Sequence, residues 1–513
     1  MTSSPLSRSS SGSFLFGQCA RFAHLTLQNA SRQTFPRVFF SAPHFYSQWR
    51  TIQRPDAALR EGAVPPEQLV QNIWHHQRLR RNDLRLLDGR TLRVLHPGFW
   101  NHGAGPDFRS AILQIERELP FSADVEVDLY SSGWRGHAHD RNPNFARVKL
   151  HVVWEGETNT SIPTLALKDC LDAPLAELAL WLASDVAERY PEQLLGKCAA
   201  PLRDLSEAQT GQLLSEAALV RLQRKAADLH AWARQLGWEQ SLWQGMLRAL
   251  GYKQNVWPMQ RMGELRTRLS SGKLSIAQLQ ARLLGVSGLL PWDVTRKQRS
   301  ADRYLRLVWD QWWRERDAFS DCALPKMAWH LHGLRPANHP QRRLALAAHW
   351  ASDGTLFKRI EKWFADAQPD RALEASLLNT LRPGVDSFWS RHWTLRSAQM
   401  PKAQPLLGAK RATDLAVNVV LPWFWVRARE GNNARLQAEA ERRYFAWPAA
   451  EDNTVLRLAR ERLLGGRKHS KLTSAAMQQG LLQIVHDFCD HSNALCADCK
   501  FPELVKNWQL AAR

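Results

Sequence analysis

Two carboxylates alternate with apolar residues in the short segment Val125-Glu126-Val127-Asp128-Leu129. In an extended strand, successive side chains point to opposite faces, so Glu126 and Asp128 share one face about 7 Å apart. Two carboxylates at this spacing repel each other. They are tolerated in water, or favoured when a divalent cation lies between them and other ligands. The spacing therefore indicates either a cation site or a solvated strand face.

A third acid stands at the entrance to the preceding strand, where Asp107 follows the turn residues Gly105 and Pro106. In an antiparallel meander the start of one strand lies near the end of its neighbour, so a register that places Asp107 beside Glu126 is available. These two carboxylates are therefore candidate ligands for a divalent cation such as Mg²⁺ or Mn²⁺.

Histidines follow the paired acids. The segment Trp134-Arg135-Gly136-His137-Ala138-His139-Asp140 comes directly after the strand. His151 lies on the last strand, where its side chain alternates away from those of Val148, Leu150 and Val152. A histidine with a pKa near neutrality can act as a general base or as a metal ligand.

Three interpretations of this segment stay open. In the first, Asp128 or His139 assists the magnesium site, supported by Trp134, His137 and His151. In the second, a transition metal such as zinc is bound directly by His137, His139, Asp140 and His151. In the third, the segment is a polar turn whose histidines satisfy backbone groups.

Short elements position these residues. After Pro65 and Pro66, the apolar spacing is typical of an amphipathic helix, with its stripe at Leu69, Val70, Ile73 and Trp74. Four runs rich in β-branched or large apolar residues are each bounded by Gly, Pro, Asp or Asn and predict strands over Thr91–Leu95, Phe108–Ile115, Val125–Tyr130 and Val148–Trp154. The order is α-β-β-β-loop-β, and the sequence predicts an α+β fold.

Helical periodicity dominates the rest of the chain. Leu175, Leu178, Leu182 and Val186 follow helical spacing, and Ser206-Glu207-Ala208-Gln209 predicts a capping box. The 23 tryptophans, such as those at 309, 312 and 313, are expected to fill helix interfaces. We therefore divide the chain into a leader (1–60), an α/β core (61–170), a mainly helical region (171–480) and a cysteine-rich segment (481–513).

The leader is rich in Ser, Arg and Phe and has no acid before Asp56. This composition is typical of a transit peptide, and an over-extended start upstream of a domain that begins near Val64 explains it equally well. Either interpretation excludes these residues from the fold.

The net charge of +20 and the pI near 10.1 indicate a polyanionic partner, first nucleic acid, in particular DNA, and second an anionic membrane surface. A solvated surface is the simpler interpretation of the basic run around Lys402, Lys410 and Arg411. No stretch reaches the ~18 apolar residues that a membrane span requires. The best candidate, Leu415–Val426, is interrupted by Asn418 and Pro422.

Seven cysteines are sparse until the end of the chain, which favours a reducing compartment, here the cytoplasm, over a secreted disulfide scaffold. Cys489, Cys496 and Cys499 have the spacing Cys-x6-Cys-x2-Cys, which suits a tetrahedral metal or an iron–sulfur cluster. A fourth ligand could come from His486, His491 or the distant Cys198. The alternative is a set of reduced cysteines without a metal.

The element order, with Pro106-Asp107 at the second strand and Glu126-x-Asp128 on the third, resembles the PD-(D/E)xK nuclease fold. The resemblance implies a restriction-endonuclease-like core in which Asp107 and Glu126 bind Mg²⁺, which would align and activate water for attack on a phosphodiester bond. It also implies that Glu67 is the extra acid of the opening helix. Asp128 replaces the lysine that ends the usual motif, so another group, such as His139 or His151, would act on the water or the developing charge. Some nucleases of this fold also hold an iron–sulfur cluster through three C-terminal cysteines and one distant cysteine, which implies Cys198 as the fourth ligand.

Longer motifs resemble the bacterial family catalogued as domain of unknown function 2851. The first of them runs from Gly98 to Trp154. Further matching segments lie at Leu334–Asn338, Asn418–Pro422 and Gln478–Leu481. The resemblance covers nearly everything after about residue 64. In that family a histidine commonly stands at the position of Asp128.

These observations lead to three hypotheses. The first is a divergent metal-dependent nuclease or phosphodiesterase whose basic helical region grips the nucleic-acid backbone. The second is a non-catalytic nucleic-acid-binding or scaffolding protein built on a decayed nuclease fold. The third is a hydrolase of small phosphorylated or acylated molecules that uses the histidines.

Overall fold

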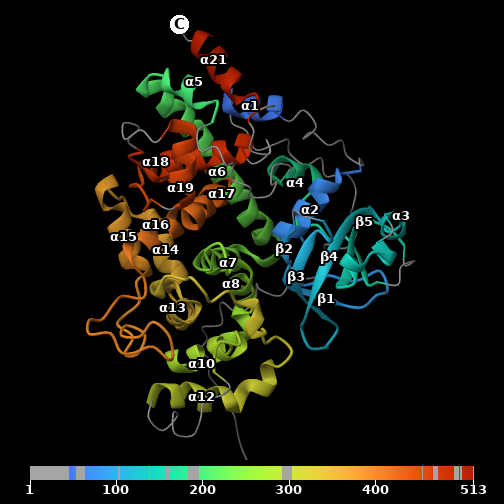
Figure 1. The fold of residues 1–513 in the computed structure, drawn as a ribbon. Helices are drawn as coiled ribbons and strands as arrows, with labels where there is room; N and C mark the ends of the chain where they lie inside the picture. Colours follow the sequence, from blue (N-terminus) through green and yellow to red (C-terminus); the bar gives the residue numbers. More distant parts are fainter. Residues whose placement is uncertain are drawn as a thin grey trace, which may run out of the picture. The chain divides into compact units, whose positions relative to one another are not determined.

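The structure is a computed structural model that describes residues 45–53, 64–101, 104–137, 139–157, 162–182, 196–291, 303–452, 454–465, 472–489, 496 and 499–511. All of them belong to one compact unit, His44–Arg513. Within this unit a mixed sheet is followed along the chain by helices (Figure 1). The fold is α+β, as the sequence predicts.

Helix α2 (Glu67–His76) begins after Pro66, as the sequence predicts. A proline suits this place because the first backbone N–H groups of a helix have no partner within it. The predicted stripe of Leu69, Val70, Ile73 and Trp74 is buried. This face packs against strands β4 and β5 and fixes the helix across the sheet.

Six strands form one sheet: β1 (Leu92–His96), β2 (Phe99–Trp100), β3 (Phe108–Ile115), β4 (Phe121–Tyr130), β5 (Val148–Glu155) and β6 (Thr164–Ala166). Their order is β1-β3-β4-β5-β6, with β2 paired to β3. The β1–β3 and β3–β4 pairs are antiparallel, and the β4–β5 and β5–β6 pairs are parallel. The four predicted strands are all present, whereas β2 and β6, of two and three residues, are too short to show a period in the sequence.

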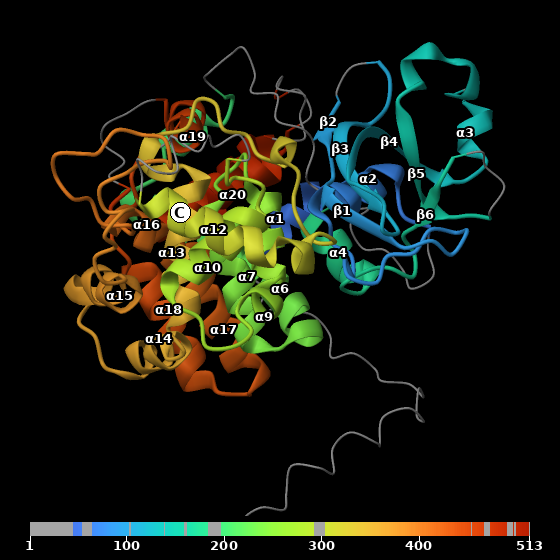
Figure 2. The same ribbon diagram turned by 90° about the horizontal axis from the view of Figure 1, so that it is seen from below.

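The crossover between the parallel strands β4 and β5 is built of three short helices, α3 (Gly133–Gly136), η2 (His139–Arg141) and η3 (Pro143–Phe145). In Figure 2, α3 lies on the side of the sheet away from the helical region. The crossover therefore carries the predicted histidine segment directly from the end of β4 to the start of β5.

The helical region is organised around the long helix α6 (Glu207–Leu236). Its N-terminus has the predicted capping box, in which Ser206 accepts from the Gln209 N–H and the Gln209 side chain accepts from the Ser206 N–H. The region further comprises α4 (Leu175–Leu182), α5 (Ala199–Arg203), α7 (Trp238–Leu250), α8 (Val256–Glu264), α9 (Arg266–Leu269), α10 (Ile276–Val286), α12 (Arg303–Glu315), α13 (Pro340–Ser352), α14 (Leu356–Ala365), α15 (Leu373–Leu381), α16 (Ala409–Leu415), α17 (Leu421–Glu430), α18 (Ala434–Ala446), α19 (Thr454–Leu464) and α20 (Ala475–Ile484). The predicted helix at 175 ends at Leu182, and Val186 lies outside the described residues.

Helix α20 crosses α6 at close range. A Cβ atom at Gly480 would collide with the backbone carbonyl of Leu214, so glycine permits the approach. Many tryptophans fill helix interfaces as predicted, for example Trp243 and Trp425, while Trp313 is half exposed and stacks on Trp309.

The predicted leader is wrong for residues 45–53. They form helix α1 (Phe45–Gln53), in which Tyr46 and Trp49 are buried. These side chains share one core with α6, α20 and the C-terminal helix α21 (Phe501–Ala511). Burial of two large aromatic side chains outweighs the polar composition around them, so α1 and the cysteine-rich segment are parts of the same packed structure.

Among the helices that the structure describes, none is long and apolar enough to span a membrane. The segment from 415 to 426 runs through α16, the π-helix η8 (Ala416–Val420) and α17, and most of its side chains are buried against other helices.

Candidate functional site

Asp107 and Glu126 lie together, as strand alternation and an antiparallel register predict. The register pairs Phe108 with Val125 and so places Asp107 beside Glu126. The Asp107 N–H donates to Glu126 Oε2 at 3.0 Å, and the Val127 N–H donates to Asp107 Oδ2 at 3.1 Å. Each carboxylate is therefore held by the backbone of the neighbouring strand.

Helix α2 adds Glu67 and Gln71 to this pair. The Gln71 side chain donates to Asp107 Oδ2 at 3.2 Å and to Glu67 Oε1 at 3.3 Å. Glu67 and Gln71 are four residues apart and so project from the same face of the helix. The packing of α2 on the sheet thus brings a third carboxylate to the acidic pair.

Asp128, on the same face of β4, is fixed by two histidines and a glycine. His151 Nε2 lies 2.8 Å from Asp128 Oδ2, and His137 Nδ1 lies 3.3 Å from Asp128 Oδ1. A Cβ atom at Gly133 would lie 2.7 Å from the Asp128 carboxyl carbon. Because Gly133 has no side chain, α3 can close over this carboxylate.

His139 is held by aromatic side chains. Its ring stacks on Phe145 with centroids 4.0 Å apart, and its centroid lies 5.4 Å from that of Trp134. Its Nδ1 lies 3.6 Å from Glu126 Oε1. His139 Nδ1 and His151 Nδ1 are buried without a hydrogen-bond partner, and the His151 side chain is fully buried. The site therefore contains two imidazole nitrogens whose bonding capacity is unused.

Three of these side chains meet at ligand distance. Ligand atoms of Asp128, His137 and His139 all lie within 4.8 Å of one another. This is the one group of three or more such side chains found among the described residues. One carboxylate and two imidazoles suit Zn²⁺ or Mn²⁺, whereas the adjoining carboxylates of Asp107, Glu126 and Glu67 suit Mg²⁺ or Mn²⁺.

The pKa values of three of the acids are raised above their ordinary values. Burial, followed by the charge of Asp107, raises the pKa of Glu126 to about 9. Burial also raises the pKa of Asp107 to about 7, with the charges of Glu67 and Asp128 adding to the effect. The pKa of Glu67 is raised as well, by burial and then by the charge of Asp128.

No lysine or arginine in the described part of the chain forms an ion pair with these four acids. In their ionised forms these acids would therefore be met only by hydrogen bonds and by histidines. A divalent cation would supply the missing positive charge and favour the ionised acids.

The structure brings together all eight residues that the sequence predicts for this site: Glu67, Asp107, Glu126, Asp128, Trp134, His137, His139 and His151. Asp140, named in the zinc interpretation, is exposed beside Arg141 instead. Sequence reasoning missed Gln71, Gly133 and Phe145. The spacing of four residues between Glu67 and Gln71 was the signal for the first, while the contacts of Gly133 and Phe145 exist only in the folded crossover.

The C-terminal cysteines form a second cluster. Burial raises the pKa of Cys198, and Cys489, Cys499 and Cys496 raise it further by their charges, so the four thiols are neighbours. Arg462 donates to Cys496 Sγ at 3.2 Å. Of the other two candidate ligands, His486 contacts Arg224 and Asp487, and His491 lies outside the described residues. The structure therefore brings Cys198 to the C-terminal thiols.

Comparison with known proteins gives a family. The family model described as "Protein of unknown function (DUF2851)" matches residues 67–453. Neither the comparison with curated proteins nor that with solved structures gave a match. The matched range contains the whole acid and histidine cluster and Cys198, and it ends before the C-terminal cysteines. The PD-(D/E)xK nuclease-like core stays a prediction.

Proposed function

The chain belongs to the DUF2851 family, and we propose that it is a metal-dependent phosphodiesterase that cleaves nucleic acid. The observation that carries the proposal is the convergence of four carboxylates and three histidines without a lysine or arginine partner among the described residues. A divalent cation is a ligand that this arrangement of acids and histidines favours, and phosphodiester hydrolysis is a common use of such cations.

The position of each residue in the site suggests its role, and the acids are placed to bind the cation. Asp107 and Glu126, with Glu67 nearby, would hold Mg²⁺ or Mn²⁺, and Asp128 and His137 would add further ligands. A cation held there polarises a phosphoryl oxygen and lowers the pKa of a bound water.

His139 is the residue placed to accept the proton of the attacking water. Burial lowers its pKa, which favours the neutral form of the ring that a general base requires. Its Nδ1 has no hydrogen-bond partner and faces Glu126. His151, clamped to Asp128 at 2.8 Å, orients that carboxylate and is a positioning residue.

The element order α2-β1-β2-β3-β4, followed after the crossover by β5, supports a nuclease-like core, with acids on β4 and directly before β3. The basic composition, with a net charge of +20, supports a nucleic-acid substrate.

Incubation with DNA and RNA substrates in Mg²⁺ or Mn²⁺ tests the proposal. Cleavage by the intact protein should fall roughly a hundredfold or more in the Asp107→Asn, Glu126→Gln double variant. Asp140→Asn, which alters an exposed acid of the same crossover, is the matched control and should cleave normally. Binding without cleavage would instead support the scaffolding hypothesis, and cleavage that survives the double variant would place the chemistry elsewhere.

We also propose that Cys198, Cys489, Cys496 and Cys499 hold an iron–sulfur cluster in the reducing cytoplasm. Four thiols are the ligand number of common [2Fe–2S] and [4Fe–4S] clusters, and Cys198 is a neighbour of the three C-terminal cysteines. Arg462 beside Cys496 would stabilise the thiolates. Iron and sulfide analysis of protein purified without oxygen tests this, with Cys322→Ser, a buried cysteine outside the cluster, as the control for Cys198→Ser.

A further inference from the structure

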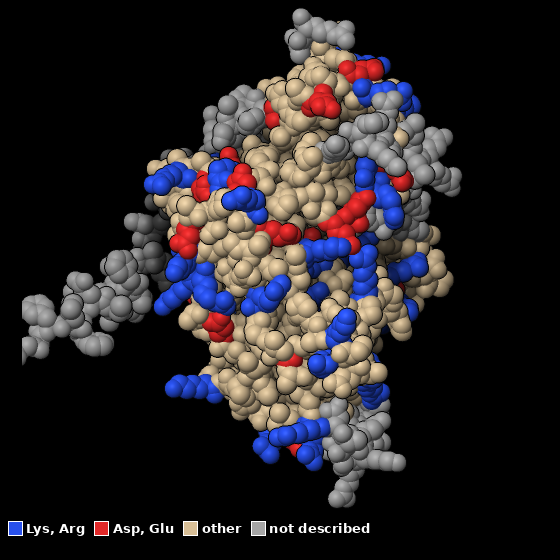
Figure 3. Space-filling view, turned by 90° about the vertical axis from the view of Figure 1, so that its left-hand side faces the viewer, with Lys and Arg blue, Asp and Glu red and all other residues tan. Residues whose placement is uncertain are grey.

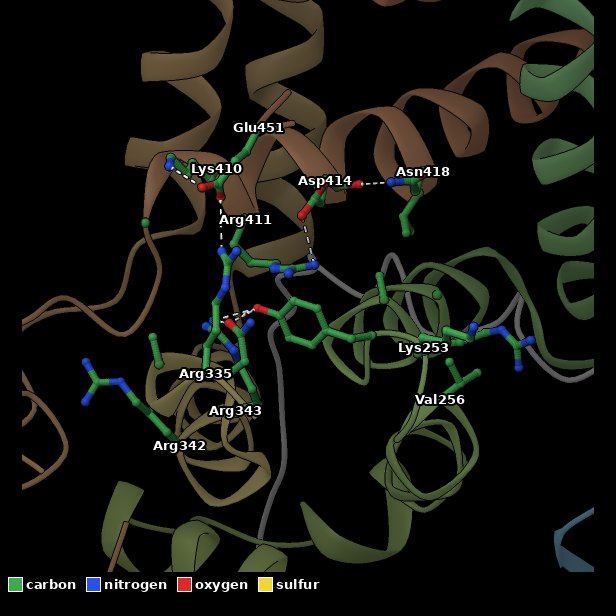
Figure 4. Close-up of a pocket in the computed structure, with 18 of the residues that line it drawn as sticks. Lys253, Val256, Arg335, Arg342, Arg343, Lys410, Arg411, Asp414, Asn418 and Glu451 are labelled. Carbon is green, nitrogen blue, oxygen red and sulfur yellow. Dashed lines mark hydrogen bonds and ion pairs between the residues drawn. The ribbon is translucent and has the colours of Figure 1, made fainter. Parts of the chain in front are cut away.

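A large cavity lies within the helical region. Its volume is about 1110 Å³, which is large enough for a nucleotide-sized ligand. Residues of α6, α7, α13, α16 and the loops before α13 and α16 line it. Figure 4 shows charged side chains from these separate segments pointing toward one another across the space.

The lining is strongly basic. It contains nine lysines and arginines against four aspartates and glutamates. On the face drawn in Figure 3, basic and acidic side chains occur close together, so surface charge alone marks no binding site. The cavity differs from this surface because its charged side chains line a concave wall that is partly shielded from water. Basic side chains also outnumber acidic ones in this wall.

The acids of the lining neutralise only part of this charge. Asp414 pairs with Arg411 at 3.0 Å, and Glu451 is shared by Lys410 at 2.7 Å and Arg335 at 3.6 Å (Figure 4). The two remaining acids pair with arginines that do not line the cavity, Asp228 with Arg78 and Asp452 with Arg460.

Several arginines of the wall are bonded only to neutral groups. Arg342 donates to backbone carbonyls, among them those of His392, Gln404 and Pro405. Arg343 donates to the Leu406 carbonyl, to the Tyr252 hydroxyl at 3.1 Å and to Asn338 Oδ1 at 2.9 Å. Neutral oxygens fix the direction of these side chains without cancelling their charge. Positive charge therefore remains in the cavity.

Lys225, on α6, adds a further basic side chain to the wall of the cavity. Its amine has no hydrogen-bond or ion-pair partner among the described residues, although it lines the cavity. Burial, followed by the charges of Arg221 and Arg224, lowers its pKa to about 7. An anion beside the amine would favour its charged form.

The wall also has aromatic surface. Trp232, Tyr252 and Trp393 line the cavity, and the guanidinium of Arg411 lies 3.5 Å from the Tyr252 ring centroid. Fixed arginines with an unpaired lysine can bind phosphate oxygens, and ring faces can contact a planar base.

We propose that this cavity binds a phosphorylated small molecule of nucleotide size, with its phosphates at Lys225 and Arg343 and its planar part against the aromatic wall. The site is separate from the metal-binding cluster on the sheet and does not depend on the function proposed above.

Calorimetric titration of the full chain with ATP, pyrophosphate and inorganic phosphate tests the proposal. EDTA is present throughout, so that no phosphate is held through a cation at the sheet. ATP or pyrophosphate should bind, and Lys225→Met should weaken the affinity at least tenfold. Lys225→Arg, which keeps the charge, should restore most of the affinity. Lys358→Met, which removes an exposed lysine on α14, is the matched control and should not change it.

The loss in Lys225→Met is interpretable because the substitution removes a buried charge and is not expected to unfold the protein. Circular dichroism and the unfolding temperature verify this for each variant. Absence of binding to all three compounds at millimolar concentration would overturn the proposal, and so would equal affinities of Lys225→Met and Lys358→Met. Binding of a single-stranded oligonucleotide at least tenfold tighter than ATP, weakened by Lys225→Met, would also overturn it in favour of a nucleic-acid groove.

Discussion

The Glu126→Gln variant removes the acid with the most strongly raised pKa of the sheet site. Glutamine keeps a side-chain oxygen that can accept the Asp107 N–H hydrogen bond. Burial and the charge of Asp107 raise the pKa of Glu126 to about 9 from an ordinary value of 4.5. Between these values the folded protein keeps a proton on Glu126 that the unfolded chain releases.

The sign of the pH effect follows from this proton. Because the folded state binds more protons than the unfolded state, the free energy of unfolding falls as pH rises from about 5 to about 9. One pKa unit corresponds to about 1.4 kcal/mol, so at pH 8 Glu126 costs the cation-free protein on the order of 5 kcal/mol at most. The variant does not carry this cost.

Urea unfolding in EDTA between pH 5 and pH 8 measures the effect. The stability of Glu126→Gln relative to the original chain should increase steadily with pH, and Mg²⁺ or Mn²⁺ should stabilise the original chain more than the variant. Glu118→Gln, an exposed acid in the turn before β4, is the control and should show no such trend. A stability difference that stays constant or shrinks as pH rises would refute the buried, uncompensated carboxylate.

Three further outcomes are expected. Gly133→Ala places a Cβ atom 2.7 Å from the Asp128 carboxyl carbon and should weaken Mn²⁺ affinity about tenfold or more in isothermal titration. Gly136→Ala is the control and should leave the Mn²⁺ affinity unchanged, because nothing lies within 4 Å of the added carbon. Trp49→Ala should cost about 3–5 kcal/mol in urea unfolding, because this side chain is only 6% exposed, while Trp313→Ala, at 51% exposure, should cost much less. Lys225→Met should raise the unfolding temperature at pH 7, because the lowered pKa of Lys225 makes its charged form unfavourable in the folded protein. This gain should vanish near pH 10.5, where the lysine of the unfolded chain loses its proton as well.

The sheet and its acids were predictable from local pattern. Alternation in Val125–Leu129 places Glu126 and Asp128 on one face in any strand, and the turn at Pro106 fixes where β3 begins. Register then follows from the hydrophobic alternation, which a shift of one residue would invert. The position of Asp107 beside Glu126 was therefore within reach of the sequence.

Contacts between distant segments were not predictable in this way. Arg411 belongs to a basic run whose simplest interpretation is a solvated surface, yet it lines a cavity against Tyr252, far away in the chain. Helix α1 was likewise not predictable from the composition of the first 60 residues, because the burial of Tyr46 and Trp49 depends on contacts with α6 and α21. Only the packed structure determines which charged or aromatic side chains leave the solvent.

Binding of Mn²⁺ by the full chain, followed by electron paramagnetic resonance at neutral pH, tests the central claim most directly. The original protein should remove free Mn²⁺ from solution and release protons as Asp107 and Glu126 ionise. The Asp107→Asn, Glu126→Gln double variant should lose this binding while Asp140→Asn retains it. Equal Mn²⁺ binding by the original protein and the double variant, or no binding by either, would contradict a cation site at the acids of the sheet.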